Sequence, residues 1–202
     1  MHEPLIYYTA VDVETPNCRN DSLCSIGVVH MEYGSPVFER EFLVNPEAHF
    51  DWMNITIHGI MPDMVADAPA FPEVWEQIKG YFEAGVVLAH NAGFDLGVIC
   101  GTLERYGIEI PAIRYLCTCK MARRLIEKQE FGNHRLNTLC EGLMIPLENH
   151  HNALCDAQAC AYLFETMTDK FGPHTAQVQA YCYKSRIKRT ASATQPTIAS
   201  EL

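Results

Sequence analysis

The chain has 202 residues and a mass of 22.8 kDa; 48% of its residues are hydrophobic, 20% are charged, and its formal net charge is −10. These values are typical of one packed globular domain with a short appendage, and they exclude a disordered or fibrous protein. The acidic balance argues against non-specific binding of nucleic acid over the whole surface, although it is compatible with a small basic path.

Nothing in the sequence predicts a membrane segment or a leader. The longest apolar runs, such as residues 85–89, are far shorter than the roughly 20 residues that cross a bilayer, and no basic region followed by an apolar one stands at the N-terminus. The nine cysteines are odd in number and several lie in apolar runs, which favours reduced thiols over disulfides. We therefore expect a cytoplasmic protein with no membrane contact.

The first part of the chain predicts an antiparallel β-meander. Residues 5–11 form a continuous apolar, β-prone run that is typical of a buried central strand and that ends at Asp12. Two further strands are expected over residues 23–32 and 36–44, with a hairpin turn at residues 33–35. Residues 45–72, rich in Pro, His and Met, are expected to form a loop.

The rest of the chain alternates helices and strands. Apolar residues at helical spacing predict an amphipathic helix over Phe71–Glu83, and a strand returns over Val86–Ala89. The remaining expected elements are helices over residues 93–106, 119–126, 136–142 and 156–171 and a short strand over residues 115–118. This order predicts an α/β fold with a mixed sheet.

The C-terminal residues 184–202 are expected to form a flexible tail after a domain over residues 1–183. Small and polar residues without a period predominate there. Residues 183–202 hold four basic residues and one acidic residue, a local formal charge of +3, which leaves −13 on the rest of the chain.

Two carboxylates, Asp12 and Glu14, stand at the carboxyl end of the first predicted strand. Their i, i+2 spacing points both side chains to the same face of the sheet. Like charges side by side at the end of a buried strand raise each other's pKa unless cations neutralise them. A solvated loop after the end of the strand would account for the pair equally well. Further carboxylates at the same place are needed to distinguish a functional site from such a loop.

Two later segments supply such carboxylates. His90-Asn91-Ala92-Gly93-Phe94-Asp95 joins a predicted strand to the next helix at the carboxyl edge of the sheet, where α/β proteins build their sites. His150-His151 precedes Asp156, which stands at the start of the last predicted helix. Singly, each aspartate is explained as an acidic residue in the first turn of a helix. Together with Asp12 and Glu14, they indicate one site.

These segments resemble the three motifs of the DEDDh 3′-to-5′ exonucleases, a family that includes proofreading epsilon subunits, exonuclease X, ribonuclease T and oligoribonuclease. The motifs are Asp12-x-Glu14, His90-Asn91-x-x-Phe94-Asp95 and His151-x4-Asp156, and their order and spacing match over residues 6–167. Ile57-His58-Gly59-Ile60 also resembles the family's His-Gly-Ile segment. The resemblance implies an RNase H-like fold: a five-stranded mixed sheet of order 3-2-1-4-5 with helices on both faces.

The resemblance also implies phosphodiester hydrolysis with two Mg²⁺ or Mn²⁺ ions. The implied ligands are Asp12, Glu14, Asp95 and Asp156. Four carboxylates balance two divalent cations, and oxygen ligands select hard cations over zinc. His151 would be the general base, a role suited to a side chain that titrates near neutrality. His150 is an alternative base, but the His-x4-Asp spacing selects His151.

Substrate contacts are implied by the same resemblance. The residues expected to touch the substrate are Thr15, His58, Asn91 and Phe94. The sequence departs from the family pattern at two nearby places, because Pro16-Asn17 stands where many relatives have Thr-Gly and Ser25 where a glutamate is common. Both departures affect how the terminal nucleotide would be held, and neither removes a ligand.

Three functions fit these motifs. The first is an exonuclease that releases nucleoside 5′-monophosphates from DNA 3′ ends. The second is an RNA-trimming exoribonuclease or oligoribonuclease, which uses the same motifs with a pocket that admits the 2′-OH. The third is a proofreading-type subunit that docks on a polymerase or sliding clamp through its tail, where residues 195–200 resemble a clamp-binding peptide without its terminal aromatic residue. We favour DNA over RNA as the nucleic acid.

Two other features have simpler interpretations. Cys117-x-Cys119 is not expected to bind zinc, because no second Cys or His pair stands at ligand spacing. Lys120, Arg123 and Arg124 lie on one predicted helix, where phosphate contact and a solvated helix face are equally consistent with the sequence.

Overall fold

The structure, a computed structural model, describes residues 4–185 apart from the side chain of His174. Its strands form one mixed sheet of order β3-β2-β1-β4-β5-β6. The strands are β1 (Tyr7–Glu14), β2 (Ser25–Glu32), β3 (Ser35–Leu43), β4 (Val86–Ala89), β5 (Arg114–Cys117) and β6 (Gln179–Ala180). The α-helices are α1 (Trp52–His58), α2 (Phe71–Glu83), α3 (Gly93–Arg105), α4 (Thr118–Leu125), α5 (Lys128–Phe131), α6 (Leu136–Leu143) and α7 (Ala153–Phe171). Two 3-10 helices are η1 (Pro62–Val65) and η2 (Pro173–Thr175).

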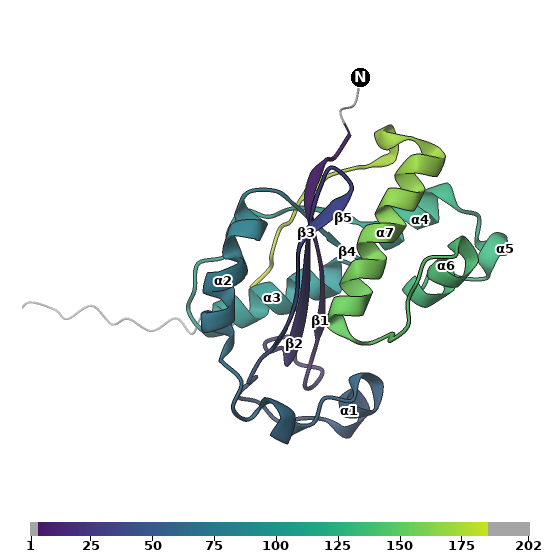
Figure 1. The fold of residues 1–202 in the computed structure, drawn as a ribbon. Helices are drawn as coiled ribbons and strands as arrows, with labels where there is room; N and C mark the ends of the chain where they lie inside the picture. Colours follow the sequence, from purple (N-terminus) through teal and green to yellow (C-terminus); the bar gives the residue numbers. More distant parts are fainter. Residues whose placement is uncertain (1–3, 186–202) are drawn as a thin grey trace, which may run out of the picture.

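Helices cover both faces of the sheet, so that β1 is buried on both sides (Figure 1). Val11 and Val13 of β1 pack into a core with α2 and α3, whereas Tyr8 and Ala10 pack into a second core with α4, α6 and α7. This alternation explains why the β1 sequence is continuously apolar. The expected α/β mixed sheet with helices on both faces is confirmed.

The hairpin between β2 and β3 fixes the register of the meander. Tyr33 and Gly34 form its two-residue turn, and both have positive φ, 51° and 76°. Turns of this kind match the right-handed twist of the flanking strands. β1 then pairs antiparallel with β2 and parallel with β4, which brings the carboxyl ends of β1 and β4 to the same edge of the sheet.

Gly27 of β2 allows α7 to pack directly on the sheet. A Cβ atom at Gly27 would lie 2.1 Å from the carbonyl oxygen of Ala153, so only glycine fits at this crossing. Gly27 is also the register partner of Asp12. The close approach therefore holds the start of α7, with Asp156, beside the carboxyl end of β1.

Several elements differ from the sequence-based expectation. The sheet has a sixth strand, β6, whose two residues pair antiparallel with β5 and are too few to give a pattern. The expected loop over residues 45–72 contains α1 and η1; α1 buries none of its residues and so lacks an amphipathic signal. Helix α7 begins at Ala153 instead of residue 156, because Asn152 accepts a hydrogen bond from the Cys155 amide and caps the helix.

The C-terminal expectations fall largely outside the described residues. Tyr183, at the expected domain boundary, donates a hydrogen bond to Glu104 at 2.8 Å. Residues 186–202, including the clamp-like segment 195–200, lie outside the described part of the chain. Within residues 4–185, no helix is both long and apolar enough to cross a membrane.

Candidate active site

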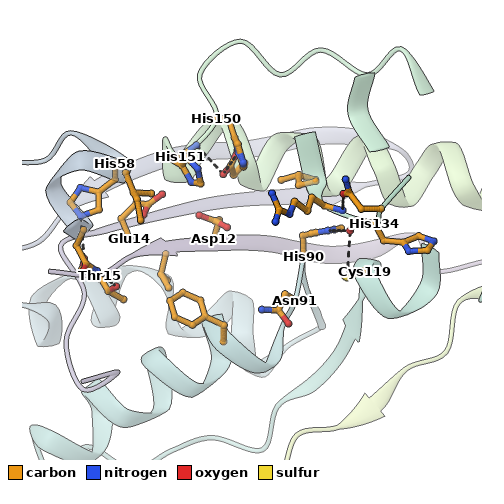
Figure 2. Close-up of a pocket in the computed structure, with 18 of the residues that line it drawn as sticks. Asp12, Glu14, Thr15, His58, His90, Asn91, Cys119, His134, His150 and His151 are labelled. Carbon is orange, nitrogen blue, oxygen red and sulfur yellow. Dashed lines mark hydrogen bonds and ion pairs between the residues drawn. The ribbon is translucent and has the colours of Figure 1, made fainter. Parts of the chain in front are cut away.

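A cleft of about 1160 Å³ opens at the carboxyl ends of β1 and β4. Figure 2 shows Asp12 near its centre, with Thr15 and His58 to one side and His90 and His134 to the other. This is the edge of an α/β sheet at which ligands commonly bind.

Carboxylates from three separate elements meet in this cleft. Oxygen atoms of Asp12, Glu14 and Asp156 all lie within 4.8 Å of one another. Asp95, in the first turn of α3, is only 2% exposed, and its Oδ2 atom is buried without a hydrogen-bond partner among the described residues. The structure thus brings together all four aspartates and glutamates that the sequence nominated as metal ligands.

The cluster is electrostatically unfavourable without cations. Burial, followed by the charges of Asp95, Glu14 and Asp156, raises the pKa of Asp12 well above its usual range. Burial, followed by the charge of Asp156, raises the pKa of Glu14 to about 8. The pKa of Asp95 is raised to about 7, chiefly by burial. A group of carboxylates with such raised pKa values favours either protonation or bound cations.

The two candidate bases both lie beside Asp156. His150 places Nδ1 at 3.0 Å from both carboxylate oxygens of Asp156, whereas His151 donates its backbone N–H to Oδ2 at 3.1 Å. The two imidazole rings stack with centroids 3.9 Å apart (Figure 2). Burial, followed by the charge of His150, lowers the pKa of His151. His151 is exposed on the cleft wall and has a positive φ of 72°.

All four expected substrate contacts line the cleft. Thr15 and His58 are joined, because the His58 Nε2 atom lies 3.1 Å from the Thr15 carbonyl oxygen. The other ring nitrogen of His58 accepts a hydrogen bond from the Ile60 amide at 3.0 Å. Because both ring nitrogens have partners within the protein, the imidazole can contact a substrate only through the face or edge carbons of its ring. Phe94 is 39% exposed and Asn91 is exposed with a φ of 75°, so neither belongs to the core.

The structure adds residues that sequence reasoning missed. Asn54 of α1 lines the cleft and donates to the carbonyl and hydroxyl oxygens of Thr15, at 2.9 and 3.1 Å. Glu41 of β3 accepts hydrogen bonds from Ser25 and Asn152, at 2.7 and 2.9 Å. No local motif marks either residue, because each acts through a partner that is distant in the sequence.

The cysteine pair shows no sign of a metal centre. Cys119 lies in the cleft and donates to the His134 carbonyl oxygen at 3.6 Å. Cys117 and Cys119 belong to no cluster of potential metal ligands within the described residues.

Comparison with known proteins identifies the family. The model of the exonuclease family RNase_T matches residues 9–164. This chain belongs to that exonuclease family. The chain is 33% identical over 162 residues to a DNA polymerase III PolC-type of Bacillus cereus and 31% identical over 165 residues to one of Staphylococcus aureus. These matches cover 79% and 81% of this chain but only 11% of each polymerase.

Solved structures agree with this assignment. Exonuclease X in complex with 5′ overhanging duplex DNA is 27% identical with a TM-score of 0.66, over 82% of this chain and 93% of that one. The nuclease domain of 3′hExo, a DEDDh family member bound to rAMP, has a TM-score of 0.71 at 14% identity, over 87% of this chain and 96% of that one, and shows the shared fold. The chain is therefore an exonuclease of the DEDDh type with an RNase H-like fold, as its motifs predicted.

Proposed function

We propose that this exonuclease hydrolyses DNA from the 3′ end and releases nucleoside 5′-monophosphates. The observation that carries the proposal is that carboxylate oxygens of Asp12, Glu14 and Asp156 lie within 4.8 Å of one another in the cleft. The charge of Asp95 acts on Asp12, and the buried Oδ2 of Asp95 has no hydrogen-bond partner among the described residues. A crowded acidic centre of this kind repels a phosphodiester unless cations are bound, so it suits metal-dependent hydrolysis.

The centre fits two divalent cations. Its ligand set consists of carboxylate oxygens, which hard cations such as Mg²⁺ and Mn²⁺ prefer. The raised pKa values of Asp12, Glu14 and Asp95 reflect negative charge that the described residues leave uncompensated. Asp12, Glu14, Asp95 and Asp156 would hold the ions. When bound, two such ions supply Lewis acidity at the phosphate and lower the pKa of the attacking water.

His151 would act as the general base. Its lowered pKa keeps the imidazole largely neutral at pH 7, the form that accepts a proton from water. The backbone of His151 is anchored on Asp156 while its side chain stays exposed in the cleft. The aspartate that helps to form the acidic centre thus also positions the proposed base.

The terminal nucleotide would lie against Thr15, the ring of His58, Asn91 and the exposed face of Phe94. Aromatic faces stack on any base, which suits an enzyme that removes successive nucleotides without regard to sequence. Asn54 keeps Thr15 in place through two hydrogen bonds.

DNA is the proposed substrate and a polymerase the proposed partner. The Bacillus cereus and Staphylococcus aureus relatives, at 33% and 31% identity, are DNA polymerases of which this chain matches 11%, and exonuclease X was solved in complex with DNA. A sliding clamp remains a second proposed partner through the C-terminal tail. An RNA-trimming activity is the alternative that the following experiment separates.

A gel assay tests the proposal directly. Single-stranded DNA, 3′-overhang duplex DNA and RNA, each labelled at the 5′ end, are incubated with Mg²⁺, Mn²⁺ or EDTA. We expect ladders shortened from the 3′ end, faster on DNA than on RNA, and no products in EDTA. Faster cleavage of RNA would favour the alternative, and full activity in EDTA after dialysis would exclude the two-metal mechanism.

A further inference from the structure

Three cations on one side of the cleft have no acidic partner among residues 4–185. They are Arg123 of α4, Lys128 of α5 and Arg135 immediately before α6, and all are exposed and line the cleft. Their side chains make no ion pair and no hydrogen bond within the described residues; the hydrogen bond from Arg135 to the Asn133 side chain is made by the Arg135 backbone N–H. In a protein of net charge −10, unpaired cations gathered at one cleft indicate an anionic ligand.

The basic residues of α4 divide into two groups. Arg124 donates to the Thr175 carbonyl oxygen at 2.8 Å, and Lys120 lies 5.7 Å over the ring of Tyr115. Neither lines the cleft, whereas Arg123 does. Of the three basic residues of α4, therefore, only Arg123 lines the cleft, and it is the one placed to contact a phosphate there.

A chain of hydrogen bonds fixes the segment that carries these cations relative to the acidic centre. His90, directly after β4, places Nε2 at 2.9 Å from the His134 carbonyl oxygen, and His134 places its own Nε2 at 2.9 Å from the Ile126 carbonyl oxygen. Because a carbonyl only accepts, Nε2 of His90 carries the proton, and Nδ1 accepts from the Thr118 hydroxyl at 3.0 Å. Burial lowers the pKa of His90 to about 4, so this ring stays neutral at working pH. The segment that carries Arg135 is thus tied to the strand end that leads to Asp95.

The two sides of the cleft differ in chemistry. Thr15 and His58, where the terminal nucleotide is proposed to lie, are on the opposite side of Asp12 from His90 and His134 (Figure 2). A strand whose scissile phosphate sits at Asp12 would leave the site along the His90 and His134 side. Its next phosphates would then meet guanidinium and ammonium groups, which are suited to binding phosphate oxygens.

We propose that Arg123, Lys128 and Arg135 form a binding site for the backbone phosphates on the 5′ side of the scissile bond. We call these three residues the cationic wall. The inference rests on the proposed function and adds to it a reason why an acidic protein binds a polyanion. The ligand class is a single-stranded phosphodiester, a chemistry that DNA and RNA share.

The test uses the full chain with Arg123→Gln, Lys128→Gln or Arg135→Gln. The matched control is Lys120→Gln, which removes the same charge from the exposed surface of α4 outside the cleft. Anisotropy of 5′-fluorescein oligothymidylate and oligouridylate, each of eight nucleotides, gives Kd over a range of salt concentrations in EDTA, where hydrolysis is not expected. The logarithm of the association constant falls linearly with the logarithm of the salt concentration. We expect each cleft variant to make this slope less steep by about 0.7, the value for one phosphate contact to a single strand.

The affinity at low salt should fall by about 3- to 10-fold in each cleft variant and stay unchanged in Lys120→Gln. The p-nitrophenyl ester of thymidine 5′-monophosphate, which has no upstream phosphate, should be hydrolysed in Mg²⁺ at the wild-type rate by all four variants. Unchanged slopes in the three cleft variants, an equal loss in Lys120→Gln, or a loss confined to one of the two oligonucleotides would each overturn the inference. If the wild type hydrolyses neither the ester nor DNA, the proposed function fails, while the slopes in EDTA still decide the inference.

Discussion

Asn152 donates a hydrogen bond from Nδ2 to the Oε2 atom of Glu41 at 2.9 Å, and this contact joins the start of α7 to β3. The other carboxylate oxygen of Glu41 accepts from the Ser25 hydroxyl at 2.7 Å. Asn152 also caps α7 through the Cys155 amide and directly follows His151. Glu41 therefore holds in place the loop that carries the proposed base.

Exchanging the two side chains tests this role of Glu41. Asn152→Asp alone places two carboxylates next to each other, and Glu41→Gln alone can place two amide N–H groups next to each other. A hydrogen bond to a charged group contributes about 1.5–3 kcal/mol. We therefore expect each single variant to lower turnover of the p-nitrophenyl ester by about 10-fold or more. The double variant Glu41→Gln/Asn152→Asp restores one donor and one acceptor at unchanged total charge. We expect it to recover most of the wild-type rate. A double variant no faster than the slower single one would show that the contact does not position the loop.

The identity of the general base is tested by two histidine variants. His151→Ala should reduce turnover by about 10²–10⁴-fold, as loss of a general base does, while metal and oligonucleotide still bind. His150→Ala should have a far smaller effect. The measurements are kcat on the ester, and Mn²⁺ affinity by calorimetry.

The pH profile supplies a second test of His151. The base must be unprotonated, and the pKa of His151 lies below its usual value near 6.5, so the wild-type rate should rise with pH in the acid range and level off by neutrality. The His151→Ala variant should lack this limb. His150 contacts Asp156 directly and is the alternative base. If His150→Ala causes the large loss of turnover and His151→Ala does not, the His-x4-Asp spacing assigns the wrong histidine.

Gly27→Ala tests the contact that places Asp156. The new Cβ would lie 2.1 Å from the Ala153 carbonyl oxygen, so α7 has to move away from β2. Overpacking of this kind costs about 1–3 kcal/mol, and Asp156 should shift with the helix. We expect a lower melting temperature together with weaker Mn²⁺ binding. Gly80→Ala, on the exposed face of α2 with no atom near the new Cβ, is the control and should leave metal binding unchanged.

Local sequence patterns predicted the helices and strands whose structure is determined by residues close to one another in the sequence. Phe71–Glu83 and Val86–Ala89 begin and end as expected, because one has a full apolar stripe and the other is buried on both faces. The three motifs lie at strand and helix ends that the topology brings to one edge. The contact between Glu41 and Asn152 spans 111 positions and involves an edge strand, so no local pattern could have indicated it. Helix α1, which buries no residue, gave no signal either.

The acidic centre should also make the stability of the metal-free protein depend on pH. Asp12, Glu14 and Asp95 have pKa values in the folded protein that lie above those of an unfolded chain, which are about 4. Between these two values the folded state binds more protons than the unfolded state. The free energy of unfolding must therefore fall as pH rises from about 4 toward 8, and bound cations should reverse the loss.

Thermal unfolding of the wild type and Asp95→Asn in EDTA, at pH 5 and pH 8, measures this effect. The wild type should melt at a lower temperature at pH 8 than at pH 5, and Asp95→Asn should reduce that difference, because it removes a buried carboxylate with a pKa of about 7. Adding Mg²⁺ at pH 8 should raise the melting temperature of the wild type more than that of the variant. Comparing the two proteins at each pH cancels the titration of groups outside the centre. If Asp95→Asn instead widens the difference between pH 5 and pH 8, the carboxylates do not repel one another in the folded state, and the case for a cation-dependent centre loses its physical basis.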